Sequence, residues 1–296
     1  MAASSSPVTA QDRLSAVLER FRVRAHLFYN GPLCGLTTFD EKGRGFLHVM
    51  REGEMEVTHS TRGLPRRLHV REPTLLFYPR HAVHRFHNPP ADGSQFTCAT
   101  LEFAGGAMNP IARALPPLIA LPLARVQGLS PALDLLFAET EQVRCGQRLL
   151  ADRLFEVVLI QLLRWLLDHP DEAGVQPGLI TGLSDPRLAR ALIAMHEAPG
   201  DAWNLERMAQ CAGMSRSAFA AAFRDVVGQT PADYLSDWRV SLAQARLRDG
   251  TPVKRLADEL GYANPSALSR AFQAKVGQSP REWLRGEAEG QDSHST

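Results

Sequence analysis

The sequence predicts an α+β protein of two domains, with a β-barrel or jelly roll first and an all-helical domain last. Three observations lead to this fold class. Short apolar segments at strand spacing fill residues 23–103, helical periodicity returns at Pro131, and one helical unit occurs twice between Asn204 and Arg285. With 296 residues, the chain is long enough to build two separate cores.

The first domain is predicted from strands that alternate apolar and polar residues and are punctuated by turns. Many short strands at this spacing favour a small barrel or jelly roll. A short helix is expected just before them, within residues 11–22. The predicted strands are Ala25–Tyr29, Leu33–Thr37, Gly45–Met50, Glu54–Thr58, Thr74–Tyr78 and Phe96–Phe103.

Two helices are predicted after a Pro-rich connector at residues 109–122. The first covers residues 131–143. The second covers residues 149–169 and is apolar on nearly every side, so we expect it to be buried. Its partner is the barrel, a second copy of the chain, or both. Residues 170–182 are rich in Gly, Pro and acidic side chains and are typical of a linker.

The composition indicates the cellular compartment in which the protein is expected. There are 33 Lys and Arg against 32 Asp and Glu, which gives a net charge of +1. No apolar run reaches membrane-spanning length and no signal peptide opens the sequence. The four cysteines show no CxxC spacing, which fits a reducing compartment. We therefore expect a cytoplasmic protein with no membrane partner.

The duplicated unit in the last third has the pattern of a helix-turn-helix. In each copy a short amphipathic helix ends at a glycine, Gly213 or Gly261, where the chain must turn sharply. A second helix with one apolar stripe follows, and it stops at Gly-Gln-Thr-Pro or Gly-Gln-Ser-Pro. A helix held in this way can lie in the major groove of DNA.

A long helix over residues 232–248 is predicted to join the two units and hold them at a fixed separation. Two recognition helices on one DNA face must meet major grooves about 34 Å apart, so a rigid connection matters. The net charge provides no broad basic field, and the basic side chains of Arg216, Arg224, Arg270 and Lys275 are the local cluster available for phosphates.

The segments Gly261–Phe272 and Gly277–Trp283 resemble the signature of the AraC/XylS transcription regulators. The resemblance covers about the last hundred residues. It implies a seven-helix DNA-binding domain with two helix-turn-helix units, preceded by a domain that senses a signal and forms a homodimer. The implied partners are DNA, a small-molecule effector or oxidant, and RNA polymerase.

The family motif places the DNA contacts on two sets of residues. Alanines at two of the positions depart from the larger polar residues usually found there, because alanine touches a thymine methyl but makes no bidentate hydrogen bond. We therefore expect the first unit to rely on phosphate contacts and shape. The implied contacts are Arg216, Ser217, Ala220, Ala221 and Arg224 in the first unit, and Asn264, Pro265, Ser266, Ala267, Ser269 and Arg270 in the second.

Residues 79–88 resemble the second sequence motif of the cupins, with His81 in the place of a glycine. The first cupin motif, which normally supplies two His and a Glu to a metal, is missing around residues 37–46. The match supports a cupin-like fold more than metal chemistry. Two alternatives stay open for the histidines: a divalent metal held by His48, His81 and His84, or an effector contact by His81 and His84 at the mouth of the barrel.

Cys34 and Cys98 fall in two predicted strands of the barrel. Some cupin-bearing relatives of the AraC type respond to oxidants through cysteines in comparable strands, so a redox role is one hypothesis. The other is that both are small buried hydrophobic residues.

These patterns together predict a DNA-binding transcription regulator with a cupin-like sensor domain; a cupin-type metal-dependent enzyme with a helical appendage is the alternative. The predicted segments are a disordered N-terminus with a short helix at 1–22, a cupin-like sensor domain at 23–130, a helical dimerisation segment at 131–169, a linker at 170–183, the AraC-type domain at 184–286 and a disordered tail at 287–296.

Overall fold

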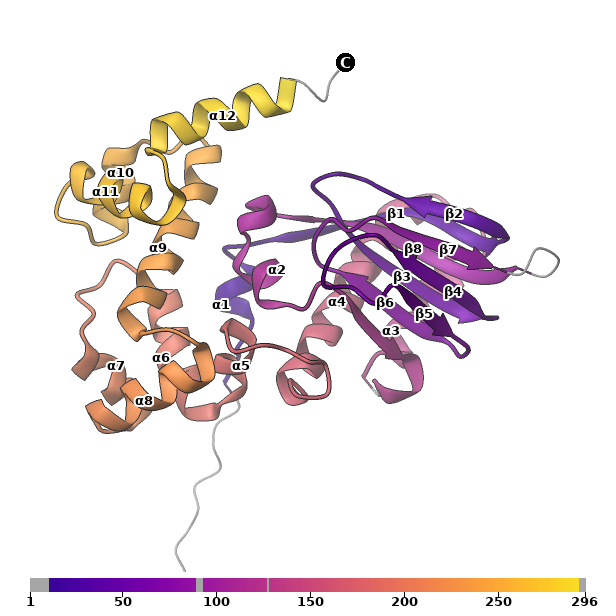
Figure 1. The fold of residues 1–296 in the computed structure, drawn as a ribbon, viewed down its shortest axis with the longest axis horizontal. Coiled ribbons are helices and arrows are strands. Elements are labelled where there is room, and N and C mark those ends of the chain that lie inside the picture. Colours follow the sequence, from indigo (N-terminus) through magenta and orange to yellow (C-terminus); the bar gives the residue numbers. More distant parts are fainter. Residues whose placement is uncertain (1–10, 89–92, 127, 293–296) are drawn as a thin grey trace, which may run out of the picture. The chain divides into compact units, whose positions relative to one another are not determined.

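A computed structural model describes residues 11–88, 93–126 and 128–292 (Figure 1). Packing divides them into two units. One runs from Phe21 to Ser184, and the other runs from Asp185 onward and includes residues 11–20. Among the described residues, no helix is both long and apolar enough to cross a membrane. Most of the N-terminal segment predicted to be disordered lies outside the described residues.

The first unit is built on two antiparallel sheets, which confirms the predicted strand-rich fold. The five-stranded sheet has the order β1-β8-β3-β6-β9, and the four-stranded sheet has the order β2-β7-β4-β5. The strands are β1 (Val23–Leu33), β2 (Gly35–Phe39), β3 (Gly45–Glu52), β4 (Met55–His59), β5 (Arg67–Val70), β6 (Thr74–Tyr78), β7 (His84–Asn88), β8 (Ser94–Phe103) and β9 (Ile119–Pro122).

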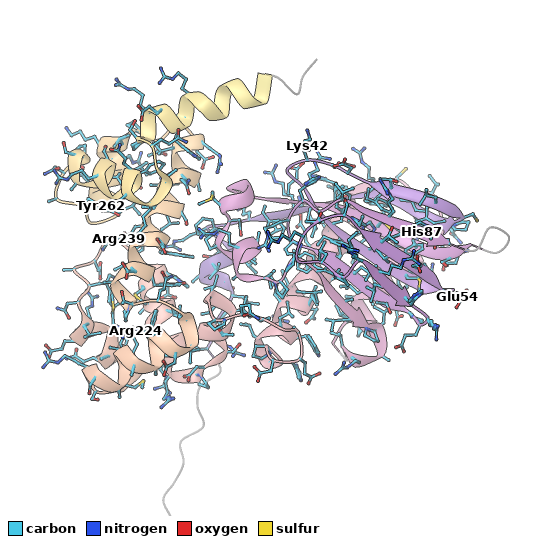
Figure 2. All side chains as sticks on the ribbon, viewed as in Figure 1. Lys42, Glu54, His87, Arg224, Arg239 and Tyr262 are labelled. Atoms are coloured by element: carbon cyan, nitrogen blue, oxygen red, sulfur yellow. The ribbon has the colours of Figure 1, made fainter. Side chains whose placement is uncertain are left out.

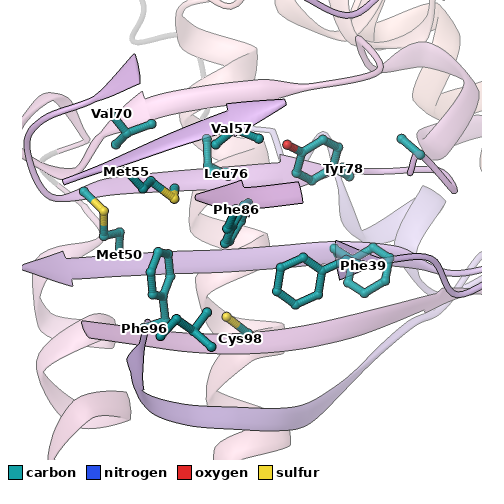
Figure 3. Packing of buried hydrophobic residues seen from close by; sticks show 13 residues of the cluster. Phe39, Met50, Met55, Val57, Val70, Leu76, Tyr78, Phe86, Phe96 and Cys98 are labelled. Atoms are coloured by element: carbon teal, nitrogen blue, oxygen red, sulfur yellow. The ribbon is translucent and has the colours of Figure 1, made fainter. Parts of the chain in front are cut away.

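The inward faces of the two sheets form one apolar core (Figure 3). Aromatic rings fill much of it: Phe86 packs edge-on to Phe39 at 4.8 Å and stacks with Phe96 at 5.3 Å between ring centroids. Pairs of this kind add about 0.5–1.5 kcal/mol each beyond the area that they bury. The core residues are Leu33, Phe39, Phe46, Met50, Met55, Val57, Val70, Leu76, Tyr78, Ala82, Phe86, Phe96 and Cys98.

The remaining elements of the first unit are helices, which lie on either side of its last strand along the chain. α4 packs against β1, and the carboxylate of Asp152 accepts a 2.7 Å hydrogen bond from the amide of Leu27 where the register of β1 shifts. A strand amide that the bulge would leave unpaired is thereby satisfied. The helices are η1 (Gly106–Met108), α2 (Pro110–Ala114), η2 (Leu123–Arg125), α3 (Ser130–Thr140), α4 (Gln147–Asp168) and α5 (Leu179–Ser184).

The second unit is helical throughout its described residues, as predicted. Seven helices follow Asp185 in this part of the chain, and α1 (Ser15–Leu18) packs against the first of them. They are α6 (Pro186–Glu197), α7 (Leu205–Ala212), α8 (Arg216–Val227), α9 (Pro231–Arg248), α10 (Val253–Glu259), α11 (Pro265–Val276) and α12 (Pro280–Asp292).

Three strands, β5, β7 and β9, were missed by the sequence analysis, for two different reasons. β5 and β9 are edge strands, where polar and proline residues are tolerated. β7 does alternate, but its inward positions hold His84, Phe86 and Asn88, so two polar residues hid the pattern. The predicted strand at Leu33–Thr37 is interrupted at Cys34, where the chain passes from one sheet to the other.

Three helical predictions need correction at their limits. The helix expected within residues 11–22 has only four residues, α1. α5 occupies the end of the predicted linker, because Leu179, Ile180 and Leu183 bury their side chains and so order this stretch. α12 continues to Asp292, so residues 287–292 are helical and not a disordered tail; residues 293–296 lie outside the described part.

Candidate nucleic-acid interface and effector site

The first helix-turn-helix consists of α7 and α8. α7 ends at Gly213, whose φ of 67° lies in the left-handed region that favours glycine. The Ser215 hydroxyl then accepts the amide of Ala218 and caps α8. Phe219 and Phe223 are fully buried on the inner face of α8, so the opposite face of this helix is presented outward.

The residues predicted to contact DNA from α8 lie on that outward face. Arg216, Ser217, Ala221 and Arg224 are exposed, and Ala220 is half-buried. Among the described residues, neither Arg216 nor Arg224 makes an ion pair with a carboxylate. Both guanidinium groups are therefore available to phosphates or bases without breaking an internal pair.

The second helix-turn-helix repeats this construction with α10 and α11. Asn264 caps α11 by accepting the Ala267 amide at 2.9 Å, while Leu268 and Phe272 are fully buried beneath the helix. The Phe272 ring meets Trp283 edge-on at 5.7 Å. Of the predicted contacts, Asn264, Pro265, Ser266 and Arg270 are exposed, and Ala267 and Ser269 are half-buried.

The two basic side chains of α11 differ in whether they are free to contact DNA. Arg270 has no carboxylate partner among the described residues. Lys275, in contrast, is bound to Asp237 of α9 at 2.7 Å. The sequence counted both residues in the local basic cluster and favoured Arg270 as the DNA contact. The ion pair makes Lys275 a link between α11 and α9, whereas the guanidinium group of Arg270 stays available.

A continuous α9 joins the two units, as predicted (Figure 1). Thr230 caps its first turn by accepting the amide of Asp233, and Pro231 occupies the start of the helix, where its missing N–H costs nothing. α9 packs on α7 and α8, and it also contacts α10, α11 and α12. The helix therefore fixes both helix-turn-helix units on one support.

The three histidines of the metal hypothesis do not come together. His48 and His84 are fully buried between the sheets, with their Nε2 atoms 2.9 Å apart. His81 lies at the surface, where its Nε2 is 2.8 Å from a carboxylate oxygen of Asp40. No group of three metal-ligating side chains occurs in the described part of the chain. A metal site at His48, His81 and His84 was therefore a wrong prediction, since residue spacing does not set the direction of a side chain.

The buried histidine pair has a defined hydrogen-bond order. Nδ1 of His84 donates to the carbonyl of Ala82 at 2.7 Å. Burial lowers the pKa of His84 to about 4, so the ring is neutral and its Nε2 accepts the proton of His48 Nε2. Burial, and then the repulsion that two protonated rings would exert on each other, lowers the pKa of His48 as well. Both Nε2 atoms are therefore engaged in this bond.

Sequence reasoning missed His59, which continues this cluster. Its Nδ1 donates to the carbonyl of Pro65 at 2.7 Å, which leaves Nε2 to accept the hydroxyl of Tyr78 at 2.8 Å. The Tyr78 ring stacks on His84 at 4.0 Å. His59 pairs directly with His84 across β4 and β7, so only knowledge of the strand register could have found it.

The two candidate redox cysteines occupy different environments. Cys98 is fully buried in β8, and burial raises the pKa of its thiol well above the ordinary value. Cys34 is exposed at the crossover between β1 and β2, not within a strand as predicted. A thiolate reacts with an oxidant only where it is formed and reachable, so Cys34 is the accessible thiol and Cys98 is a core residue.

Two sheets packed around an apolar core, followed by paired helix-turn-helix units on one long helix, define a cupin-type domain joined to a DNA-binding type of domain. Comparison with known families supports both assignments. A cupin model matches residues 12–168, more than half of the chain, and a helix-turn-helix domain model matches residues 208–286. The chain belongs to the cupin family and carries the AraC-type arrangement in its C-terminal part.

Relatives with this arrangement are named as regulators. An AraC-like transcription regulator of Streptomyces antibioticus is 34% identical over 186 residues, which cover 62% of this chain and 61% of that protein. The RCS-specific transcriptional activator RclR of Escherichia coli is 27% identical and is matched over 72% of this chain and 76% of its own length. The DNA-binding domain of AdpA, solved with a target DNA, is 30% identical over 33% of this chain and 89% of its own, with a TM-score of 0.31.

Proposed function

We propose that this protein is a sequence-specific DNA-binding transcription regulator. The observation that carries the proposal is the pair of outward-facing helices, α8 and α11, on one uninterrupted α9. Three exposed guanidinium groups on them, those of Arg216, Arg224 and Arg270, have no carboxylate partner among the described residues. The proposed contacts are the residues that the family motif implies, with Arg270 as the base-reading or phosphate-binding residue of α11.

A footprint of the full-length protein on the DNA upstream of its own gene tests this function. Specific protection of a site, absent on scrambled DNA of equal length and at equal salt, is the expected result. Equal binding to both DNAs under every effector and redox condition would contradict the proposal.

The cupin-like domain is proposed to sense a small effector or an oxidant and to change how the helix-turn-helix units bind. The accessible thiol of Cys34 supports the oxidant alternative, as does the RCS-specific name of the relative in Escherichia coli. Replacing Cys34 with Ser is then expected to abolish an oxidant response while leaving DNA affinity intact. A normal oxidant response in Cys34→Ser would contradict a sensing role for the thiol of Cys34.

A homodimer is part of the proposal because apolar side chains remain uncovered on α3 and α4. Leu135, Leu150, Val157 and Ile160 are 54%, 43%, 43% and 36% exposed, although α4 buries its other apolar face within the unit. A patch of this kind marks a protein contact more often than a free surface. We assign this patch to a contact with a second copy of the chain. The proposal also includes a cytoplasmic location and RNA polymerase as a further partner.

The cupin-enzyme alternative is not favoured by any feature of the site. Side chains of the apolar core line the interior between the sheets, and the buried histidines His48 and His84 bond to one another and to the backbone. We therefore propose a non-enzymatic role. Stoichiometric iron, nickel or manganese in the purified protein, retained after dialysis, would revive the enzyme alternative.

A further inference from the structure

The loop between α6 and α7 is a rigid element of the first helix-turn-helix unit. The indole Nε1 of Trp203 donates to the carbonyl of Ala198 at 2.7 Å. Arg207 pairs with the carboxylate of Asp201 at 2.6 Å, and its guanidinium lies 4.2 Å above the Trp203 ring. Contacts within the loop and with Arg207 of α7 therefore fix its conformation.

α9 holds this loop through Arg239. The guanidinium Nε donates to the carbonyl of Pro199 at 2.7 Å, and Nη2 donates to that of Asp201 at 3.0 Å. The same guanidinium lies 5.7 Å from the ring of Tyr262, which follows the turn of the second unit. Figure 2 shows Arg239 beside Tyr262, with Arg224 on the first unit. One side chain of α9 therefore touches both helix-turn-helix units.

The two helix-turn-helix units also meet backbone to backbone, at Gly200 and Gly261. A Cβ added to Gly200 would overlap the carbonyl oxygen of Glu259, and a Cβ added to Gly261 would overlap that of Gly200. Gly200 does not have a positive φ, so its own backbone conformation does not demand glycine. Glycine is needed there because the second unit lies against it.

We infer that this contact, Gly200 against Gly261 tied by Arg239, sets the separation and orientation of α8 and α11, together with α9. These residues position the recognition helices without touching DNA, and the inference rests on the proposed function. A helix alone fixes the distance between the units, but it permits bending and twisting about its axis. The lateral contact removes that freedom, so the protein binds two major grooves at one spacing only.

The test uses the full-length protein with Gly200→Ala and a DNA that carries two half-sites, one for α8 and one for α11 of the same chain. We expect the variant to bind about 100-fold more weakly, because engaging the second groove no longer benefits from a fixed effective concentration. The second readout is spacing. Inserting one base pair between the half-sites is expected to weaken the wild-type protein and to leave the variant unchanged.

Two further variants keep the test decisive. Gly277→Ala is the matched control: Gly277 has a φ of 86°, yet no atom lies within 4 Å of an added Cβ, so it changes strain but not the contact. Its spacing preference should match the wild type. Arg239→Lys should reproduce the loss of spacing preference if Gly200→Ala fails to fold. If the folded variants discriminate spacing as well as the wild type, the inference is wrong, while absence of specific wild-type binding would instead refute the proposed function.

Discussion

Acid should destabilise the DNA-binding unit through His196 of α6. This side chain is fully buried; its Nε2 shares a 2.7 Å hydrogen bond with the hydroxyl of Tyr234, and its ring stacks on Trp238 at 3.8 Å. Burial, and then the charge of Arg20, lowers the pKa of His196 to about 3. In the unfolded chain the imidazole of His196 takes up a proton near pH 6.5, whereas in the folded chain the same ring stays neutral at that pH. The unfolded state therefore binds more protons, and the free energy of unfolding falls as the pH drops below 6.5.

The size of the effect follows from the two pKa values. Each pH unit between them is worth about 1.4 kcal/mol, so His196 alone should remove about 2 kcal/mol between pH 7 and pH 5. The loss continues down to about pH 3. Since a typical domain has only about 5–15 kcal/mol of stability, this is a large share.

Urea unfolding of the full-length protein at pH 7 and pH 5, followed by tryptophan fluorescence, measures this loss. Trp203, Trp238 and Trp283 all report on the DNA-binding unit. His196→Gln should be less stable at pH 7 but should lose about 2 kcal/mol less on acidification. His69→Gln is the control, because His69 is exposed. An unchanged pH dependence in His196→Gln would refute the reasoning.

Three other predictions concern the proposed surfaces. Arg270→Ala should weaken specific DNA binding by about 1–3 kcal/mol in a gel-shift titration, whereas Arg187→Ala, whose guanidinium is paired with Asp185, should not; equal effects would contradict the role of Arg270. Phe272→Ala should lower the free energy of unfolding by about 3–5 kcal/mol in the same urea assay, and a loss below 1 kcal/mol would mean that the second unit is not packed as described. Val157→Glu should convert the proposed dimer to a monomer, measured by light scattering, and an unchanged mass would contradict a role of α4 in the interface.

The helical half of the fold was largely predictable because its signals are local. The glycine at Gly213 and the caps at Ser215 and Asn264 stand in the sequence where the structure uses them. Buried Phe223 and Phe272 follow the helical period. Each of these features is set by residues within a few turns of one another, so the pattern alone carries the information.

The sensor unit and the contact between the helix-turn-helix units were not predictable in the same way. The pairing of His48 with His84 depends on which strands are neighbours and on the register between them. The need for glycine at Gly200 arises from Glu259 and Gly261, far along the chain. Spacing of histidines suggested a metal site, but three-residue spacing in and beside β7 sends their side chains in different directions.

Interference footprinting on the specific DNA target tests the central claim most directly. For each copy of the chain on the DNA, guanine methylation should block binding at a pair of patches on one face of the duplex, about one helical turn apart. Arg270→Ala should erase sensitivity at only one patch of each pair. A single patch, two patches on opposite faces, or no position of interference would contradict a regulator that places α8 and α11 in successive major grooves.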